Sequence, residues 1–259
     1  PVYTFSKEKV RRNHIFSLEK MRRAYNREQN PHTDSLMHRN IIQALHQWKN
    51  KAKRKPLIIR GARQVGKTWA MRHFGAEAFA QTAYINFDHN PRMQALFAGD
   101  YDIGRLLLGL KIESGVDIQA ENTLLIFDEI QEVPSALSCL KYFHENAPQY
   151  PIIAAGSLLG VSLHQQSSFP VGKVEFLPLY PMDYREFLIA LGQKDLAELL
   201  DSRDWPLITA MKSRYIELLR QYHYVGGMPE VVQTYLDTQN LDEVRQIQRD
   251  LLLAYEQDF

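Results

Sequence analysis

The chain has 259 residues, of which 45% are hydrophobic and 24% charged, as expected for a globular protein with one large domain or two small ones. It has no uncharged apolar run of about 18 residues and no apolar signal core near its start, so we expect a cytoplasmic protein without membrane contact. A single cysteine, Cys139, excludes an intrachain disulfide and fits a reducing compartment.

The net charge of +1 conceals an asymmetry. Residues 1–55 hold 14 Lys and Arg against 4 Asp and Glu, whereas the other 204 residues hold 17 against 26. A basic arm beside an acidic body is typical of proteins that bind nucleic acid or an acidic partner. The alternative is a solvated leader, or one that docks on the acidic body of the same chain.

Residues 1–36 show weak hydrophobic periodicity and are predicted to be a basic N-terminal extension that need not be native to the domain. A helical pattern begins near Met37, where Ile41, Ile42, Leu45 and Trp48 recur on one face. Residues 49–55 form a basic linker into the first predicted strand.

A phosphate-binding motif follows that strand. Residues 61–68 read GARQVGKT, which fits G-x-x-x-x-G-K-T, between the apolar residues 56–60 and a helical run. Glycines let the backbone wrap an anion, and loop amides at a helix N-terminus favour phosphate. In such a loop Lys67 contacts the β- and γ-phosphates and Thr68 binds Mg²⁺. The expected nucleotide-binding residues are Gly61, Ala62, Arg63, Gln64, Val65, Gly66, Lys67, Thr68 and Trp69.

Further strands are predicted at residues 82–88, 123–129, 151–155 and 173–180. Helical patterns separate them, at residues 92–120 with a loop near 113–115, and at 134–146. Strands alternating with helices favour a parallel sheet. With the phosphate-binding motif, this predicts an α/β P-loop NTPase fold with a doubly wound, five-stranded parallel sheet.

Two acids end the third strand, and such strand ends form the binding edge of a parallel sheet. Asp128 is expected to hold Mg²⁺ opposite Thr68, and ATP is the expected nucleotide. Glu129 is expected to orient and deprotonate the attacking water, because adjacent side chains on a strand point in different directions. Lys67, Glu129 and Ser157 are the expected catalytic residues.

Ser157 ends the fourth predicted strand, where a polar side chain can hold water or sense the γ-phosphate; a helix cap or turn serine is the alternative. A second cation would also stabilise the transition state. Arg63, Lys173, Arg185 and Arg214 are candidates, although none has a diagnostic spacing.

From residue 181 the pattern is helical, with a glycine turn at 226–227 before Pro229. Residues 37–180 are thus the expected ATPase core and residues 181–259 a lid-like helical segment. Apolar side chains near Phe259 suggest that the sequence stops before a further C-terminal domain.

Several stretches together resemble a prokaryotic AAA-type ATPase family, AAA_14, often followed by a DUF4143 domain. They are PLIIRGARQVGKT at 56–68, YINF at 84–87, LIFDEIQ at 125–131, AGS at 155–157, VGKV at 171–174, LYPMDYREF at 179–187 and GGMPE at 226–230. The resemblance covers residues 37–235. It implies a P-loop NTPase fold of the additional-strand, AAA-like class, ATP binding, hydrolysis and a helical segment after the core.

The first functional hypothesis is an Mg²⁺-dependent ATPase that couples hydrolysis to conformational change or to remodelling of an unknown protein partner. A second is a nucleotide-gated switch or scaffold with low turnover, since no arginine finger is obvious. A third is a nucleic-acid-dependent ATPase that uses the basic N-terminal region. A homo-oligomer is compatible with each.

Overall fold

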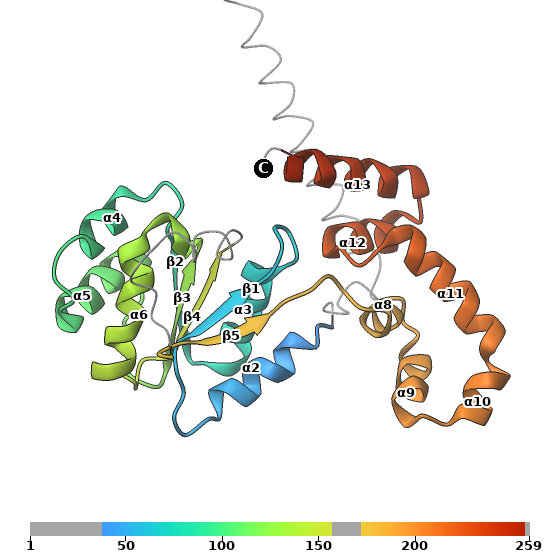
Figure 1. Ribbon diagram of the computed structural model, residues 1–259, viewed down its shortest axis with the longest axis horizontal. Helices are drawn as coiled ribbons and strands as arrows, with labels where there is room; N and C mark the ends of the chain where they lie inside the picture. Colours follow the sequence, from blue (N-terminus) through green and yellow to red (C-terminus); the bar gives the residue numbers. More distant parts are fainter. Residues whose placement is uncertain (1–37, 157–171, 257–259) are drawn as a thin grey trace, which may run out of the picture. The chain divides into compact units, whose positions relative to one another are not determined.

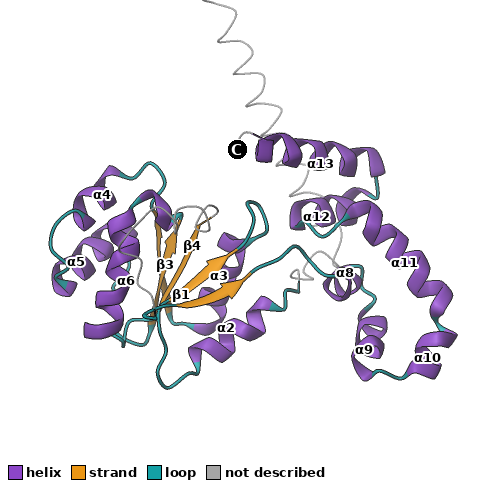
Figure 2. Cartoon of the chain, viewed as in Figure 1, coloured by secondary structure: helices purple, strands orange, loops and turns teal. Residues whose placement is uncertain are grey.

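The computed structural model describes residues 38–156 and 172–256. The elements described below all lie within one compact unit, Arg39–Phe259. The parallel sheet has the order β2-β3-β4-β1-β5 (Figures 1 and 2). Its strands are β1 (Leu57–Arg60), β2 (Gln81–Asn86), β3 (Thr123–Asp128), β4 (Ile152–Gly156) and β5 (Glu175–Pro178). The five-stranded parallel sheet predicted from the sequence is therefore confirmed.

Strand β4 lies between β1 and β3, and it pairs in parallel with both. This is the additional-strand arrangement, in which one strand separates the strand before the phosphate loop from the strand that ends in the acids. Because the strands are parallel, the loop after β1 and the acid at the end of β3 lie at the same edge of the sheet.

Helices cover both faces of the sheet (Figure 2). On one face, α2 (Ile41–Lys49) and α3 (Lys67–Ala78) bury Leu45, Trp48 and Phe74 in one apolar cluster. On the other, α4 (Pro91–Phe97), α5 (Ile103–Ser114) and α6 (Pro134–Asn146) pack in a second cluster. Alternate residues of the central strands supply the two clusters, as the period of two in a strand requires. Because both faces of these strands are buried, their sequences are continuous apolar runs.

The predicted helical stretch at residues 92–120 is two helices. Helix α4 ends at Phe97, and α5 starts only at Ile103, where the Asp102 side chain accepts a hydrogen bond from the backbone N–H of Arg105. The residues between them, including Gly99 and Asp100, lack helical periodicity, and the sequence interpretation passed over this cap. The predicted loop near 113–115 is present, because Gly115 ends α5 in the left-handed conformation (φ 68°).

After β5 the described chain is helical, as predicted. The helices are α8 (Tyr184–Ala190), α9 (Lys194–Ser202), α10 (Trp205–Ala210), α11 (Lys212–Val225), α12 (Pro229–Thr238) and α13 (Leu241–Glu256). Asp183 and Glu186 form a capping box at the start of α8. Within residues 38–156 and 172–256, no helix combines the length and apolar character needed to cross a bilayer.

Candidate functional site: the phosphate loop and the end of β3

The loop at residues 61–66 turns sharply from β1 into α3. Gln64 and Gly66 adopt positive φ values of 62° and 95°, and Gly66 is the N-cap of α3. At Gly61 the reason for glycine is close approach, since a Cβ there would lie 2.3 Å from the backbone oxygen of Leu179. The loop amides thus lie at the N-terminus of α3, a setting that favours anions.

Lys67 is the first residue of α3 and is only 6% exposed. Its Nζ donates hydrogen bonds to the backbone oxygens of Gly61 (2.9 Å) and Ala62 (2.8 Å). Burial lowers the pKa of Lys67, while the negative charges of Glu129 and Asp128 act in the opposite direction. The two carboxylates therefore only partly compensate the ammonium group for its burial. A phosphate bound in the loop would add the negative charge that is missing.

The hydroxyl of Thr68 and the carboxylate of Asp128 meet directly. Thr68 Oγ1 donates to Asp128 Oδ2 over 2.7 Å, although the two residues are 60 positions apart. Tyr84 on β2 donates its hydroxyl to the same oxygen over 2.8 Å. Asp128 is 3% exposed, so these bonds are its compensation for burial. The pKa of Tyr84 rises to about 12, first through burial and then through its hydrogen bond to Asp128.

These oxygens suit magnesium. The ion prefers oxygen ligands and keeps several waters, so it needs only one or two protein ligands beside the phosphates of a nucleotide. Thr68 and Asp128 would supply them. In the described part of the chain, no group of three or more His, Cys, Asp or Glu side chains is arranged to hold a metal by itself. The donor set thus fits a metal that arrives with a phosphate ligand.

Glu129 follows directly after β3 in the left-handed conformation (φ 51°). Its backbone N–H donates to Asp128 Oδ1 over 3.2 Å, and its Oε2 accepts a hydrogen bond from Gln131 Nε2 over 2.7 Å. A non-glycine residue at positive φ is uncommon and indicates a constrained position. The turn separates the two carboxylates, one bonded to Thr68 and Tyr84, the other to Gln131.

The remaining predicted site residues differ in their surroundings. Trp69 is 37% exposed and stacks on His73, with ring centroids 4.9 Å apart. Ser157 lies outside the described residues. Among the proposed second cations, Lys173 pairs with Glu145, Arg185 with Asp201 and Arg214 with Glu217. Arg63 lies in the loop, and its backbone oxygen accepts a hydrogen bond from Tyr255 of α13 over 2.5 Å.

Two residues at this edge were missed by the sequence interpretation. Tyr84 reads as an ordinary aromatic strand residue, and only the pairing of β2 with β3 brings it to Asp128. Arg39 stands among many basic residues near the N-terminus, yet it is 4% exposed and bonds to Val65 of the loop. A buried arginine has no signature of its own in a basic stretch, so no pattern singled it out.

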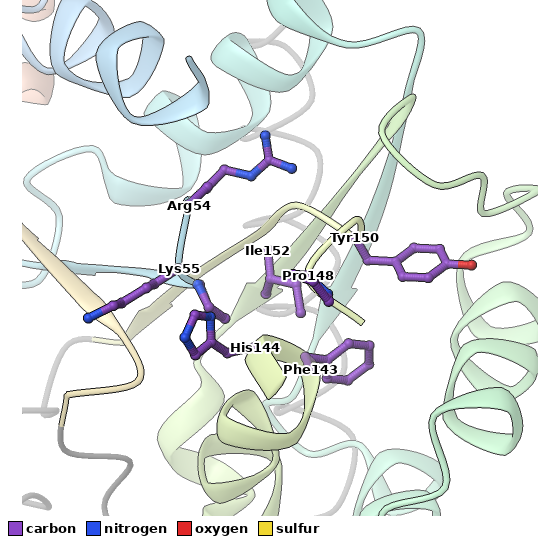
Figure 3. Close-up of a pocket in the computed structure, with 8 residues that line it drawn as sticks. Arg54, Lys55, Phe143, His144, Pro148, Tyr150 and Ile152 are labelled. Carbon is purple, nitrogen blue, oxygen red and sulfur yellow. The ribbon is translucent and has the colours of Figure 1, made fainter. Parts of the chain in front are cut away.

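The opposite edge of the sheet has a hollow (Figure 3). It lies where β1 and β4 begin, and Lys55, His144, Pro148 and Ile152 are among the residues that line it. Burial lowers the pKa of His144, and the charges of Lys173 and Lys55 add to the effect. Lys55 Nζ already donates to the backbone oxygen of Gly172 over 2.7 Å. The hollow therefore offers a ligand less uncompensated charge than the phosphate-loop edge does.

Most basic side chains of the linker at residues 49–55 form hydrogen bonds or ion pairs with other parts of the protein. Lys49 donates to the backbone oxygen of Ala78, Lys51 pairs with Glu175, and Arg54 pairs with Glu121 over 3.2 Å. These contacts favour the docked alternative for this part of the basic region. Residues 1–37, which carry most of the other positive charges, lie outside the described residues.

The loop and the strand order together define the class of this protein: it has the fold of a P-loop nucleoside triphosphatase of the additional-strand, AAA-like kind. More particularly, the chain belongs to the AAA_14 family of AAA domains, whose family model matches residues 53–188. The resemblance seen in the sequence is therefore confirmed for the AAA domain. The match does not extend to the DUF4143 domain that often follows in this family.

Solved structures resemble this chain at low sequence identity. The Walker-type ATPase paby2304 of Pyrococcus abyssi is 16% identical, with a TM-score of 0.54 over 87% of this chain and 76% of that one. Drosophila ORC bound to DNA is 15% identical, with a TM-score of 0.44 over 82% of this chain and 66% of that one. No curated protein sequence matches this chain. The likeness to the archaeal ATPase concerns the fold alone.

Proposed function

We propose that this protein binds ATP with Mg²⁺ at the phosphate loop and hydrolyses it. The observation that carries the proposal is the 2.7 Å hydrogen bond between Thr68 and Asp128, since it joins the two oxygen donors that a nucleotide-bound magnesium ion needs. The AAA domain family supports nucleotide binding and hydrolysis at the level of the family.

The proposed roles follow from the surroundings of each residue. The loop amides and Lys67 hold the β- and γ-phosphates. Thr68 and Asp128 would hold a Mg²⁺ ion, which when bound would neutralise charge on the phosphate oxygens. Glu129 accepts a proton from a water molecule as that water attacks the γ-phosphorus. The bond from the γ-phosphorus to the bridging oxygen breaks, and ADP and phosphate leave. Trp69, on the exposed side of α3 next to the loop, is proposed to contact the nucleotide.

Binding and hydrolysis are tested separately with two variants. Lys67→Ala should weaken binding of a fluorescent ATP analogue roughly 10- to 100-fold, because a hydrogen bond with a charged partner contributes about 1.5–3 kcal/mol. Glu129→Gln should bind the analogue like wild type but release phosphate about 10²–10⁴ times more slowly, which is the usual contribution of a general base.

Glu132→Gln is the matched control for the second variant. Glu132 is an exposed carboxylate three positions further along, and its substitution should leave turnover unchanged. Equal phosphate release by Glu129→Gln and wild type would exclude the proposed role of Glu129. Unchanged analogue affinity in Lys67→Ala would overturn the nucleotide site itself.

The second candidate function is a nucleotide-gated switch with little turnover. It is supported by the ion pairs of Lys173, Arg185 and Arg214, each with a carboxylate, which compete with any role in stabilising a transition state. Steady-state phosphate release by the isolated chain distinguishes the two. Turnover that rises steeply with protein concentration would favour an ATPase completed by a second copy. Remodelling of a protein partner and a role for nucleic acid at the basic N-terminal region remain proposals of the same kind.

A further inference from the structure

Arg39 connects three parts of the chain that are far apart in sequence. Its Nη1 donates to the backbone oxygen of Val65 in the phosphate loop (3.1 Å), and its Nη2 donates to the backbone oxygen of Tyr180 after β5 (2.7 Å). Its Nε donates to Glu186 Oε1 on α8 (3.3 Å). Each acceptor meets a different nitrogen of one planar group, so the guanidinium fixes their relative positions.

The carboxylate that pairs with Arg39 is fully bonded. Glu186 Oε1 also accepts from the backbone N–H of Asn40 (2.6 Å), and Oε2 accepts from the backbone N–H of Asp183 (3.0 Å). The side chains of Arg39 and Glu186 are 3% and 6% exposed. A buried ion pair persists only where further hydrogen bonds satisfy both partners, and such a pair holds one geometry.

The segment at residues 179–182 is also held between the loop and the turn before α12. A Cβ on Gly61 would lie 2.3 Å from the oxygen of Leu179, and one on Gly227 would lie 2.1 Å from the oxygen of Met182. The backbone N–H of Met182 donates to the oxygen of Gly227 over 2.7 Å. With backbone in contact on both sides, this segment cannot shift without moving either the loop or α12.

Arg39 also sets the direction in which one amide of the loop points. In a planar trans peptide the C=O and the next N–H point in opposite directions. The hydrogen bond from Arg39 to the oxygen of Val65 therefore directs the N–H of Gly66 away from Arg39. Gly66 has a φ of 95°, so its conformation is the special one that the loop requires.

We infer that Arg39 is a positioning residue that holds the phosphate loop ready for an anion and couples occupancy of the loop to helices α8 and α12. The inference rests on the proposed nucleotide site. Loop and helices bind the same guanidinium, so a ligand that fixes the oxygen of Val65 also fixes Tyr180 and Glu186. In return, motion of α8 changes the loop and hence its affinity, because coupling between sites is reciprocal.

The test compares Arg39→Lys with wild type by two measurements. A lysine keeps the charge near Glu186 but cannot donate to three separated acceptors in a fixed plane. Affinity for an ATP analogue should fall roughly tenfold, which is within the range of coupled sites. In hydrogen exchange, the analogue should slow the amides of α12 in wild type and slow them much less in the variant. Arg92→Lys is the control, because Arg92 makes two hydrogen bonds to Glu113 at the surface.

A second variant guards against loss of folding. Arg39→Met combined with Glu186→Gln removes both charges and leaves no buried charge unpaired. If this folded double variant binds the analogue like wild type and α12 is protected as before, the inference is overturned. A merely structural Arg39 would lower the melting temperature and leave the affinity of the folded protein unchanged, which also overturns it.

Failure of the proposed function gives a different pattern. If wild type binds no nucleotide, the inference is decided by exchange in the free protein. Arg39→Lys should then exchange faster at residues 65–68 and in α12, whereas Arg92→Lys should not. Equal exchange in Arg39→Lys and wild type would refute the positioning role by itself.

Discussion

Gly227→Ala should loosen the contact between the turn before α12 and the segment that follows β5. A Cβ at this position would lie 2.1 Å from the oxygen of Met182, 3.0 Å from its nitrogen and 3.1 Å from its carbonyl carbon. All three are backbone atoms, so no side-chain rotation can relieve the overlap. The two segments must separate, and the 2.7 Å hydrogen bond from Met182 N–H to the Gly227 oxygen is lost or stretched.

The expected loss of stability is the sum of two costs, the steric overlap and the weakened hydrogen bond. Overpacking costs about 1–3 kcal/mol, and a backbone hydrogen bond about 1 kcal/mol. The free energy of unfolding should thus fall by roughly 2–4 kcal/mol. For a chain of this size about 1 kcal/mol corresponds to 2–4 °C, so the melting temperature should fall by roughly 4–16 °C. Differential scanning calorimetry measures it.

Gly104→Ala is the matched control for this substitution. Gly104 lies in the first turn of α5, and a Cβ there meets only Asp102 Oδ1, at an ordinary 3.4 Å. Alanine is the better helix former, so this variant should be neutral or stabilised by up to about 1 kcal/mol. If Gly227→Ala melts within 1 °C of wild type, its free energy of unfolding has changed by ~0.3 kcal/mol or less. That result would refute the claim that the backbones at Gly227 and Met182 are too close for a Cβ.

The remaining predictions concern two buried groups. The pKa of Tyr84 rises to about 12, above its usual value of 10.0, so the stability it contributes is present below about pH 10 and is lost as pH rises towards 12. Wild type should therefore lose stability relative to Tyr84→Phe over that range, and parallel curves would contradict this. Burial raises the pKa of the Cys139 thiol to about 12, so a thiol reagent at pH 8 should react only when the native structure opens. Labelling that does not speed up with added denaturant would show that Cys139 is accessible in the folded state.

The sheet was predictable because its signals are local. The apolar runs at β1, β3 and β4 are continuous, which is typical of strands buried on both faces, and a glycine motif marks the end of β1. The additional-strand class implied only that β4 lies between β1 and β3; the places of β2 and β5 in the sheet were not predicted. The break between α4 and α5 was missed because apolar residues stand on both sides of it. Gly99 and Asp102 alone are a weak signal for the end of one helix and the start of the next.

The site was predictable only where chemistry and chain position coincide. Lys67, Thr68 and Asp128 occur at fixed places in two short motifs, so their convergence could be expected from sequence. Tyr84 begins one of the family-like stretches, which gave it no role, and Arg39 lies in none of them. Each reaches the site through tertiary contacts: a neighbouring strand for Tyr84 and a buried ion pair for Arg39. Pairings of this kind depend on side-chain packing across elements, which the periodicity of a single element does not encode.

A loop that offers its amides to an anion must also place its carbonyl oxygens, and the structure gives partners to several of them. Lys67 donates to the oxygens of Gly61 and Ala62, and Arg39 donates to the oxygen of Val65. Two of the three donors of the Lys67 ammonium are used in this way, and the third remains for a phosphate. The two cations thus stabilise the loop from its carbonyl side, and this arrangement supports the proposed anion site. Positive charge close to the loop also adds to the attraction for phosphate, so the same side chains contribute to shape and to affinity.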